Sequence, residues 1–592
     1  MQARSNLSHT DIFDANTEFH VAITSETFNN LKQALSNTKG PNAGESERGA
    51  YCIVTRSTGY NRVTYLVQEV VTPEEGEVYW SGYDDETREG LQFEADYRDR
   101  AVEAASEVDG AGIMLVHTHP RGQARPSPGD YPADAKDLYT AAQRLEENAP
   151  LAAAVWSESG SWHVRACEMQ IARTPGQRDS DAYGPDSAMW HDATAIRVVG
   201  DTFEKLETTT GATGPEGTRG PIDSDLVESS EEIWGGEGHE QLAGLRVGVI
   251  GCGGGGSILA EWLPRLGVGE LVLVDFDRLE KANFNRHQGS IRADIDENRL
   301  KVRVSARVAK QSAVAEQFEV RPVVGSVVES AREEYDPLKH VLDCDVIFNA
   351  ADPHWARNVV DDIAHAHLIP VIDAGSDLDT NADGKLTSNA QSNVSIAGPG
   401  HPCLECADMY DPKRIGEEKE GVDPEPYLDE ESGDDEDGVR APSVISMNGF
   451  VESLALQRLQ ALTLGVAPEM KIGVLRYLPA SASLRWRMDG RNDLNSCKES
   501  CKRTSDIVAA GDTINEELDR YVDPRLSEQI EDGLEKSGVV APAASGVEEH
   551  SGSSGTDEYE KPRNRESETI LSRIRKEISH VLTLSKKRVF AG

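Results

Sequence analysis

The chain has 592 residues with 60 basic and 103 acidic side chains, which give a formal net charge of −43 at pH 7. This negative surplus repels nucleic-acid phosphates, and no stretch approaches the roughly 18 consecutive apolar residues of a transmembrane helix. The first residues lack the apolar core of a signal peptide, and eight cysteines in so long a chain do not form a disulfide scaffold, so we expect a cytoplasmic protein.

Changes in composition divide the chain into four parts. Residues 1–175 alternate short apolar runs with helical patterns, which predicts a mixed α/β domain. Residues 176–240 are rich in Gly, Thr, Pro and acidic residues and should be mostly linker, with a short element near 195–206. Residues 241–515 alternate strands and helices in the manner of βαβ units, with an acidic insert at 415–438. Residues 516–592 should be a mostly disordered tail with a terminal helix at 567–587.

A metal-binding pattern follows the apolar run at 112–116. His117 and His119 are two residues apart, so on a strand both imidazoles point to the same face. Ser127 and Asp130 follow after seven intervening residues, and two imidazoles with one carboxylate leave the fourth zinc position to water. Zinc lowers the pKa of that water, and a carboxylate must take and return its proton. The candidate for this base is Glu47, at the entry to another predicted strand.

A lone His-x-His pair is usually an ordinary surface or core pair, but the full spacing resembles the JAMM (MPN/JAB) metallopeptidase family over roughly residues 19–173. The resemblance implies an N-terminal α/β metallopeptidase domain that cleaves isopeptide or peptide bonds after the C-termini of ubiquitin-like proteins. It also implies that Ser127 stabilises the oxyanion of the tetrahedral intermediate. The Glu-x-Gly pattern before a strand favours Glu47 as the base over the nearby Glu45.

A glycine-rich loop follows the strand predicted at 246–250. It reads Gly251-Cys252-Gly253-Gly254-Gly255-Gly256-Ser257 and leads into a helix near residue 258. Glycines let the backbone approach phosphates, and the helix N-terminus adds a positive dipole. The loop lacks the Gly-Lys-Ser/Thr ending of a Walker A motif. Alone, the loop does not distinguish a dinucleotide site, a mononucleotide site and mere tight packing. Asp275 and Asp277 end the next strand, but a dinucleotide enzyme would also have an acid there.

The residues that come next favour ATP. Asn283, Arg286 and Lys301 follow the acidic strand end, and Asp352 ends a further strand. Hydride transfer does not need Arg and Lys over the phosphates together with an acid for Mg²⁺. Attack of a carboxylate on the α-phosphate of ATP does need them, because charge must be neutralised there and on the leaving pyrophosphate.

This set resembles the ThiF/MoeB/ubiquitin-activating family over roughly residues 241–464. The resemblance implies a Rossmann-like domain with a predominantly parallel sheet, which dimerises and uses ATP and Mg²⁺ to adenylate the C-terminal glycine of a ubiquitin-like protein. The implied roles are ribose binding for Asp275, phosphate binding for Arg286 and Lys301, metal binding for Asp352, and nucleotide support for Asn283 and Asp277.

Four cysteines have the spacing of zinc ligands. Cys403 and Cys406 are separated by two residues, and Cys497 and Cys501 by three. Tetrahedral zinc accepts both spacings, so a structural four-cysteine site is expected, as the ThiF/MoeB resemblance also implies; two pairs of unliganded thiols are the alternative. The segment before the helix expected at 449–464 has no cysteine that could form a thioester. Either the acyl-adenylate passes directly to a downstream thiol or persulfide, or a cysteine of the zinc region is the nucleophile.

Together the motifs predict a bifunctional enzyme, a zinc isopeptidase and an ATP-dependent adenylyltransferase that process and activate one ubiquitin-like protein. The protease would trim a precursor or release the modifier from its targets, and a conjugating enzyme would be a further partner. The alternative substrate is a sulfur-carrier protein that ends as a thiocarboxylate in cofactor or cysteine biosynthesis, and the missing thioester cysteine favours it. A third interpretation makes one domain a degenerate scaffold, against which the completeness of both residue sets argues.

Overall fold

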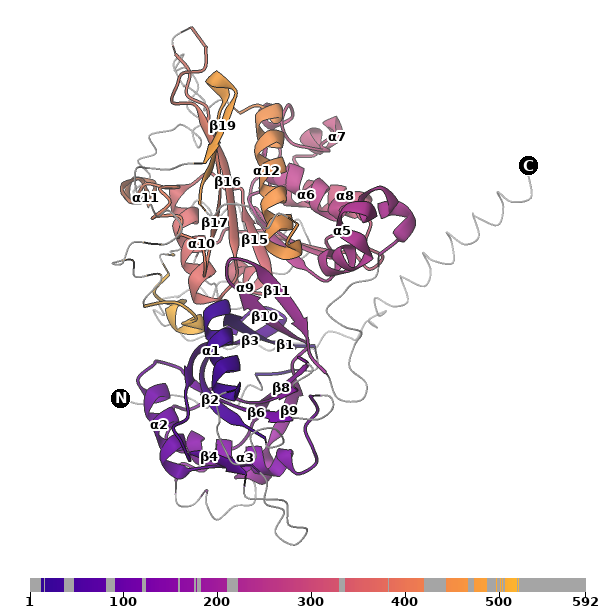
Figure 1. Cartoon of the computed structure of the whole chain (residues 1–592). Coiled ribbons are helices and arrows are strands. Elements are labelled where there is room, and N and C mark those ends of the chain that lie inside the picture. The colour runs from indigo at the N-terminus through magenta and orange to yellow at the C-terminus, as the bar shows by residue number, and fades with distance from the viewer. Residues whose placement is uncertain are drawn as a thin grey trace, which may run out of the picture. The chain divides into compact units, whose positions relative to one another are not determined.

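The computed structural model describes residues 12–520 with gaps, the longest at 37–46, 81–90, 210–221, 420–442 and 487–496. These residues belong to one compact unit, Met1–Ala541, which contains a nine-stranded and an eight-stranded sheet (Figure 1). The terminal helix expected at 567–587 and most of the acidic insert at 415–438 lie outside the described residues. None of the helices in the described part of the chain combines the length and apolar character of a membrane span.

The nine-stranded sheet has the order β11-β10-β1-β3-β2-β6-β7-β8-β9. Helix α1 (Ser25–Ser36) packs on one face, and α2 (Ala95–Ser106) and α3 (Asp130–Ala142) pack on the other. Both faces of its central strands are therefore buried, which is why those strands read as continuous apolar runs. The strands are β1 (Glu18–Thr24), β2 (Gly49–Thr58), β3 (Arg62–Val71), β6 (Gly112–His119), β7 (Leu151–Ser157), β8 (Trp162–Glu168), β9 (Met189–Asp192), β10 (Ala195–Val199) and β11 (Phe203–Glu207). A separate two-stranded sheet pairs β4 (Val78–Trp80) with β5 (Leu91–Phe93).

The segment 176–240, expected to be mostly linker, instead forms strands of the first sheet and most of a helix before the second. Strands β9, β10 and β11 extend the first sheet, and α5 (Ser224–Ala243) precedes the second. The short element expected at 195–206 corresponds to β10 and β11. Strand β10 is buried because it pairs in parallel with β1 from the start of the chain. The composition of the segment does not indicate that distant pairing, and its many Gly and Thr residues led to the prediction of a linker instead of strands.

The eight-stranded sheet has the order β14-β13-β12-β15-β16-β17-β18-β19. Pairing is parallel from β14 to β16 and antiparallel from β16 to β19, close to the predominantly parallel sheet expected. The strands are β12 (Arg246–Ile250), β13 (Glu270–Val274), β14 (Glu319–Val323), β15 (Val346–Asn349), β16 (Val371–Asp377), β17 (Gln391–Ala397), β18 (Leu475–Leu478) and β19 (Ser483–Trp486).

Helices cover both faces of this second sheet (Figure 1). One face carries α6 (Gly256–Leu266), α8 (Lys301–Ser312) and α12 (Ile445–Leu464). The other carries α9 (Pro337–Leu342), α10 (His354–Ala366) and α11 (Pro412–Lys419), while α7 (Arg292–Asp296) lies in the connection before α8.

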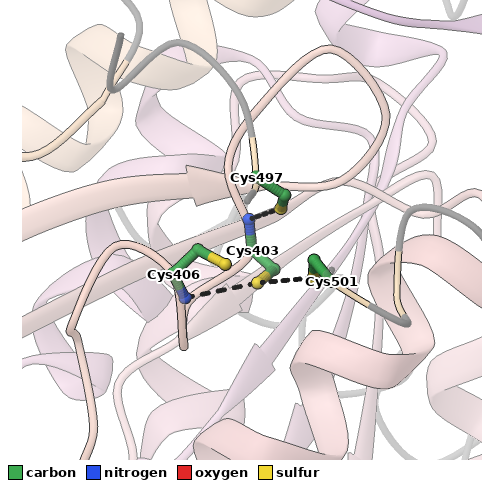
Figure 2. A group of neighbouring side chains, drawn as sticks. All are labelled: Cys403, Cys406, Cys497 and Cys501. Carbon is green, nitrogen blue, oxygen red and sulfur yellow. Dashed lines mark hydrogen bonds between the residues drawn. The ribbon is translucent and has the colours of Figure 1, made fainter. Parts of the chain in front are cut away.

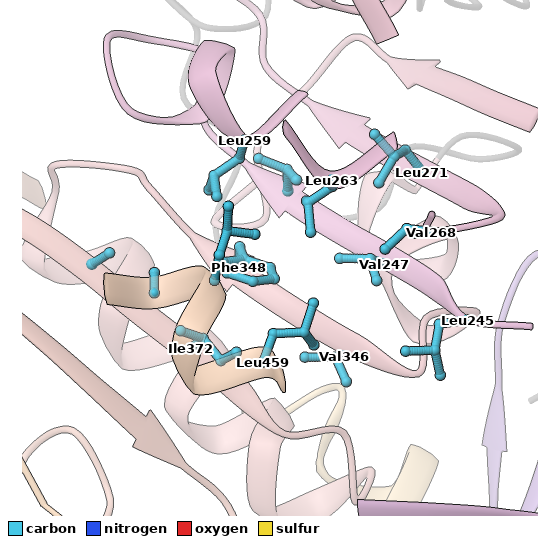
Figure 3. Close-up of a cluster of buried hydrophobic side chains, with 14 of the residues drawn as sticks. Leu245, Val247, Leu259, Leu263, Val268, Leu271, Val346, Phe348, Ile372 and Leu459 are labelled. Atoms are coloured by element: carbon cyan, nitrogen blue, oxygen red, sulfur yellow. The ribbon is translucent and has the colours of Figure 1, made fainter. Parts of the chain in front are cut away.

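Apolar side chains fill the space between this sheet and the helices on its α6 face. Val247 of β12 and Phe348 of β15 are fully buried and belong to one cluster with Leu259 and Leu263 of α6 and Leu459 of α12 (Figure 3). This core holds the carboxyl ends of β12, β13 and β15 in register, which is the edge where open α/β sheets bind their ligands.

Buried charges connect the two sheets within the unit. Asp345, just before β15, accepts hydrogen bonds from Arg62 of β3 at 2.8 Å and from Lys205 of β11 at 2.9 Å. Arg246, the first residue of β12, pairs with Glu18 of β1 at 3.0 Å. Each of these pairs joins the N-terminal α/β part to the start of a strand in the second sheet.

Candidate active sites

The three candidate zinc ligands meet where β6 ends and α3 begins. Oδ2 of Asp130 lies 3.7 Å from Nε2 of His117 and 3.4 Å from Nε2 of His119. The ligand atoms of the three residues all lie within 4.8 Å of one another. Within the described part of the chain the buried Nε2 of His117 has no hydrogen-bond partner, so a polar atom is left for a metal ion to satisfy. Two imidazoles and a carboxylate fit zinc.

Glu47 and Ser127 lie beside this cluster. Oε1 of Glu47 is 3.9 Å from Nε2 of His119. Burial raises the pKa of the Glu47 carboxyl, which suits a group that must take up and return a proton. The hydroxyl of Ser127 donates to Oδ1 of Asp130 at 2.8 Å, and its backbone N–H donates to Oδ2 at 2.5 Å. Ser127 thus orients a candidate ligand in this structure, and its role at the oxyanion stays a prediction.

Asp134 and Arg165 form a buried ion pair next to the candidate zinc ligands, and the sequence did not predict either residue for the site. Asp134 lies one helical turn after Asp130 on α3, and Arg165 of β8 donates to its Oδ2 at 2.5 Å. Burial alone lowers the pKa of His117, but the nearby carboxylates of Asp130 and Asp134 outweigh it and raise the pKa. The only trace of this arrangement in the sequence is the i, i+4 spacing of the two aspartates.

In the glycine-rich loop after β12, two glycines are tightly packed and a third has open space beside it. Gly251 has a φ of +86°, and a side chain there would meet the backbone of Ala350 at 3.0 Å. A Cβ on Gly256 would lie 1.7 Å from the carbonyl oxygen of Gly251. These two glycines are needed for packing. At Gly253 a Cβ would meet nothing within 4 Å, so the backbone is accessible there to a ligand.

Two side chains of α12 lie against the same loop and were not anticipated. A Cβ on Gly254 would lie 2.3 Å from Nδ2 of Asn448, and one on Gly255 would lie 2.3 Å from Oε1 of Glu452. Both side chains are nearly fully buried. Their four-residue spacing places the two polar groups on one side of the helix, a signal that could have been read as a site.

Acidic and basic side chains gather next to the loop. Asp275 follows β13 and accepts hydrogen bonds from the backbone N–H groups of Cys252 at 2.6 Å and Asp277 at 2.7 Å. Burial, followed by the charge of Asp277, raises the pKa of Asp275 to about 6. Nζ of Lys301, at the start of α8, donates to Oδ2 of Asp277 at 2.7 Å.

Arg286, Asn283 and Asp352 belong to the same edge of the sheet. Cδ of Arg286 lies 3.5 Å from the position that a Cβ on Gly254 would take. Asn283 accepts a hydrogen bond from the backbone of Glu280 at 3.0 Å and so caps the turn that carries Arg286. Asp352 is exposed just beyond β15, the neighbour of β12. The structure therefore brings the predicted nucleotide residues to the carboxyl ends of β12, β13 and β15, and their individual roles stay predictions.

The four cysteines with zinc-ligand spacing come together from distant segments (Figure 2). Their sulfur atoms all lie within 4.8 Å of one another, and Sγ of Cys403 is 3.6 Å from Sγ of Cys501. The backbone N–H of Cys403 donates to Sγ of Cys497 at 3.1 Å. With Cys406 as the fourth thiol, the group fits a tetrahedral structural zinc better than two unliganded pairs.

The other four cysteines are all buried, and burial raises the pKa of each thiol. Cys252, inside the glycine-rich loop, is fully buried. A thiol in such surroundings is a poor nucleophile, because the thiolate is the reactive form. These residues are Cys52, Cys167, Cys252 and Cys344.

Comparison with known proteins shows a ThiF family domain at residues 228–476. The SAMP-activating enzyme E1 of Haloferax volcanii is 30% identical over 172 residues, which are 29% of this chain and 56% of that protein. The ubiquitin-like modifier-activating enzyme 5 of Caenorhabditis briggsae is 50% identical over 48 residues, 8% of this chain and 11% of that protein. The chain thus spans about half of the first relative and about a tenth of the second. Among solved structures, E. coli MccB with ATP is 17% identical with a TM-score of 0.34, and the match covers 45% of this chain and 71% of that one.

Proposed function

We propose that the ThiF domain adenylates the C-terminal glycine of a ubiquitin-like or sulfur-carrier protein with ATP and Mg²⁺. The observation that carries the proposal is the meeting of the accessible Gly253 backbone with Asp275, Arg286 and Lys301 at one edge of the sheet. The carboxylate of the carrier would attack the α-phosphorus and displace pyrophosphate. Arg286 and Lys301 supply positive charge for the phosphates, and the exposed Asp352 is the candidate ligand of Mg²⁺. The similarity to two activating enzymes supports a protein as the substrate.

We further propose that the N-terminal α/β part is a zinc-dependent isopeptidase or peptidase. Bound by His117, His119 and Asp130, zinc would supply an activated water at neutral pH. Glu47 lies where it could take the proton of that water and return it to the leaving amine. Ser127 would help to bind the oxyanion.

The two activities have a common substrate in this proposal, the C-terminus of one carrier protein. Trimming would expose the glycine that the ThiF domain then adenylates, and removal of the modifier from its targets would recycle it. A conjugating enzyme and a second copy of the ThiF domain are the proposed protein partners. The sulfur-carrier alternative is favoured by one observation. The cysteine inside the nucleotide loop, Cys252, is buried and has a raised pKa, which disfavours it as a thioester nucleophile.

Intact mass spectrometry of the carrier, with ATP–pyrophosphate exchange, tests both proposals. The purified protein is incubated with ATP, Mg²⁺ and a ubiquitin-like protein that carries residues beyond its terminal glycine. The wild type should trim and then adenylate it, and Asp352→Ala should block only adenylation. Glu47→Ala should leave this carrier untrimmed but still adenylate a carrier that is supplied ending at its glycine. Glu147→Ala, an exposed acid between α3 and β7, is the matched control and should change neither step. A carrier that is neither shortened nor activated by the wild type would contradict the common substrate.

A further inference from the structure

Glu452 is a buried carboxyl group to which the proposed reaction assigns no role. It lies on α12 with 3% of its surface exposed. Its Oε2 atom is buried and has no hydrogen-bond partner among the described residues. Buried polar atoms in folded proteins are nearly always hydrogen-bonded, so an unpaired one calls for an explanation.

The Glu452 carboxyl fills the space between the glycine-rich loop and the end of β15. A Cβ on Gly255 would lie 2.3 Å from Oε1 and 3.3 Å from Cδ of Glu452. The same Cβ would be 3.8 Å from Cβ of Ala350, the first residue after β15. One turn earlier on α12, Asn448 occupies the corresponding place next to Gly254. The two α12 side chains thus line one side of the loop, while Gly253 is open to a ligand.

A charged group of β16 acts on Glu452. Asp373 of β16 is the titratable group whose charge reaches Glu452. Asp373 is itself held by Nε of Arg357, at 3.2 and 3.3 Å from its two oxygens, and by Nδ2 of Asn349 at 2.6 Å. Arg286, in the connection between β13 and α7, lies next to Gly254 of the glycine-rich loop. Burial, and then the charge of Asp373, raises the pKa of Glu452 to about 8, so the group is largely uncharged at neutral pH.

We propose that Glu452 is a positioning residue that holds the glycine-rich loop ready for the phosphates of the nucleotide. The inference rests on the proposed adenylation and adds a determinant of nucleotide binding to it. Packing of the carboxyl against Gly255 fixes the backbone at the N-terminus of α6, whose N–H groups can then face phosphate oxygens. An ionised carboxylate at this place would repel the phosphates, since two negative charges in a poorly solvated site interact strongly.

Isothermal titration calorimetry of the full chain with MgATP at pH 7 and pH 9 tests this role. If the protonated form is the one that binds, a pKa of about 8 leaves roughly a tenth of the wild type competent at pH 9. Its apparent Kd should then rise about ten-fold between the two pH values. Glu452→Gln keeps the shape and has no proton to lose, so it should bind as tightly as the wild type at pH 7 and keep that affinity at pH 9. Glu452→Ala should bind more weakly at both.

Three outcomes would overturn the inference. The Gln variant could lose as much affinity at pH 9 as the wild type, which would assign the pH dependence to another group. It could bind no better than the Ala variant at pH 7, which would show that the acid itself is required. Absence of MgATP binding by the wild type at pH 7 would refute the proposed adenylation, and the positioning role with it. If the Ala variant does not fold, the affinities of the wild type and the Gln variant at the two pH values still test the inference.

Discussion

Replacement of Asp345 by Asn tests the buried charges that connect the two sheets. The side chain of Asp345 is fully buried and accepts hydrogen bonds from Nη1 of Arg62 at 2.8 Å and Nζ of Lys205 at 2.9 Å. It also accepts one from the backbone N–H of Arg246 at 3.0 Å. Asparagine keeps the shape of the side chain and removes the negative charge that faces two buried cations.

The expected loss of stability is large because the cations stay buried. Loss of one partner from a buried ion pair costs about 3–5 kcal/mol. Arg62 keeps a second partner in Glu18 at 3.1 Å, so we expect the lower end, about 3 kcal/mol at pH 7. The entropy of unfolding is about 2.1 cal/mol/K per residue, so in a unit of this size each kcal/mol lowers Tm by about 1 °C, and a decrease of roughly 3 °C should follow.

The effect should also depend on pH. Burial by itself raises the pKa of Asp345, but the charges of Lys205 and Arg62 outweigh it and hold the pKa well below its usual value. A lowered carboxyl pKa contributes stability that is present above the unfolded value near 4 and is lost as the pH falls through the folded value. The difference between wild type and Asp345→Asn should therefore be full at pH 7 and shrink below about pH 4.

Differential scanning calorimetry of the full chain at pH 7 and pH 3.5 measures this difference. The control is Asp99→Asn, because Asp99 pairs with Arg144 at the surface, where the two side chains are 56% and 51% exposed. Such a pair contributes about 0–1 kcal/mol, so the control should be nearly neutral. A Tm decrease for Asp345→Asn no larger than that of the control would refute the inferred network.

Four further substitutions test the candidate sites. Gly256→Ala should lower Tm because its Cβ would lie 1.7 Å from a backbone oxygen. Gly253→Ala should leave Tm unchanged and weaken MgATP binding, measured by calorimetry. A Tm that falls for Gly253→Ala and not for Gly256→Ala would contradict the accessible position of Gly253. Cys403→Ser should lower the zinc content measured by elemental analysis by about one ion per chain. An unchanged zinc content would mean that the thiols are unliganded. Asp134→Asn should weaken the second zinc about 10–100-fold in a chelator competition, as expected for a residue that orients ligands, and equal affinity would remove it from the site.

Local patterns in the sequence were sufficient for much of both sites. The alternation of a β-strand places His117 and His119 on one face, and the structure has them at the end of β6. The apolar run before the glycine-rich loop predicted β12, and the cysteine spacings predicted the cluster of four thiols. These features depend on residues a few positions apart, whose relative geometry follows from the local backbone.

Only the tertiary structure decided which distant segments complete the sites. It placed Asn448 and Glu452 of α12 against the glycine-rich loop and buried Asp345. It also drew β10 into the first sheet from a segment whose composition resembled a linker. Such contacts join residues far apart in the chain, and their free energy comes from the burial and charge pairing that the folded arrangement creates. The periodicity of a single segment contains no information about them.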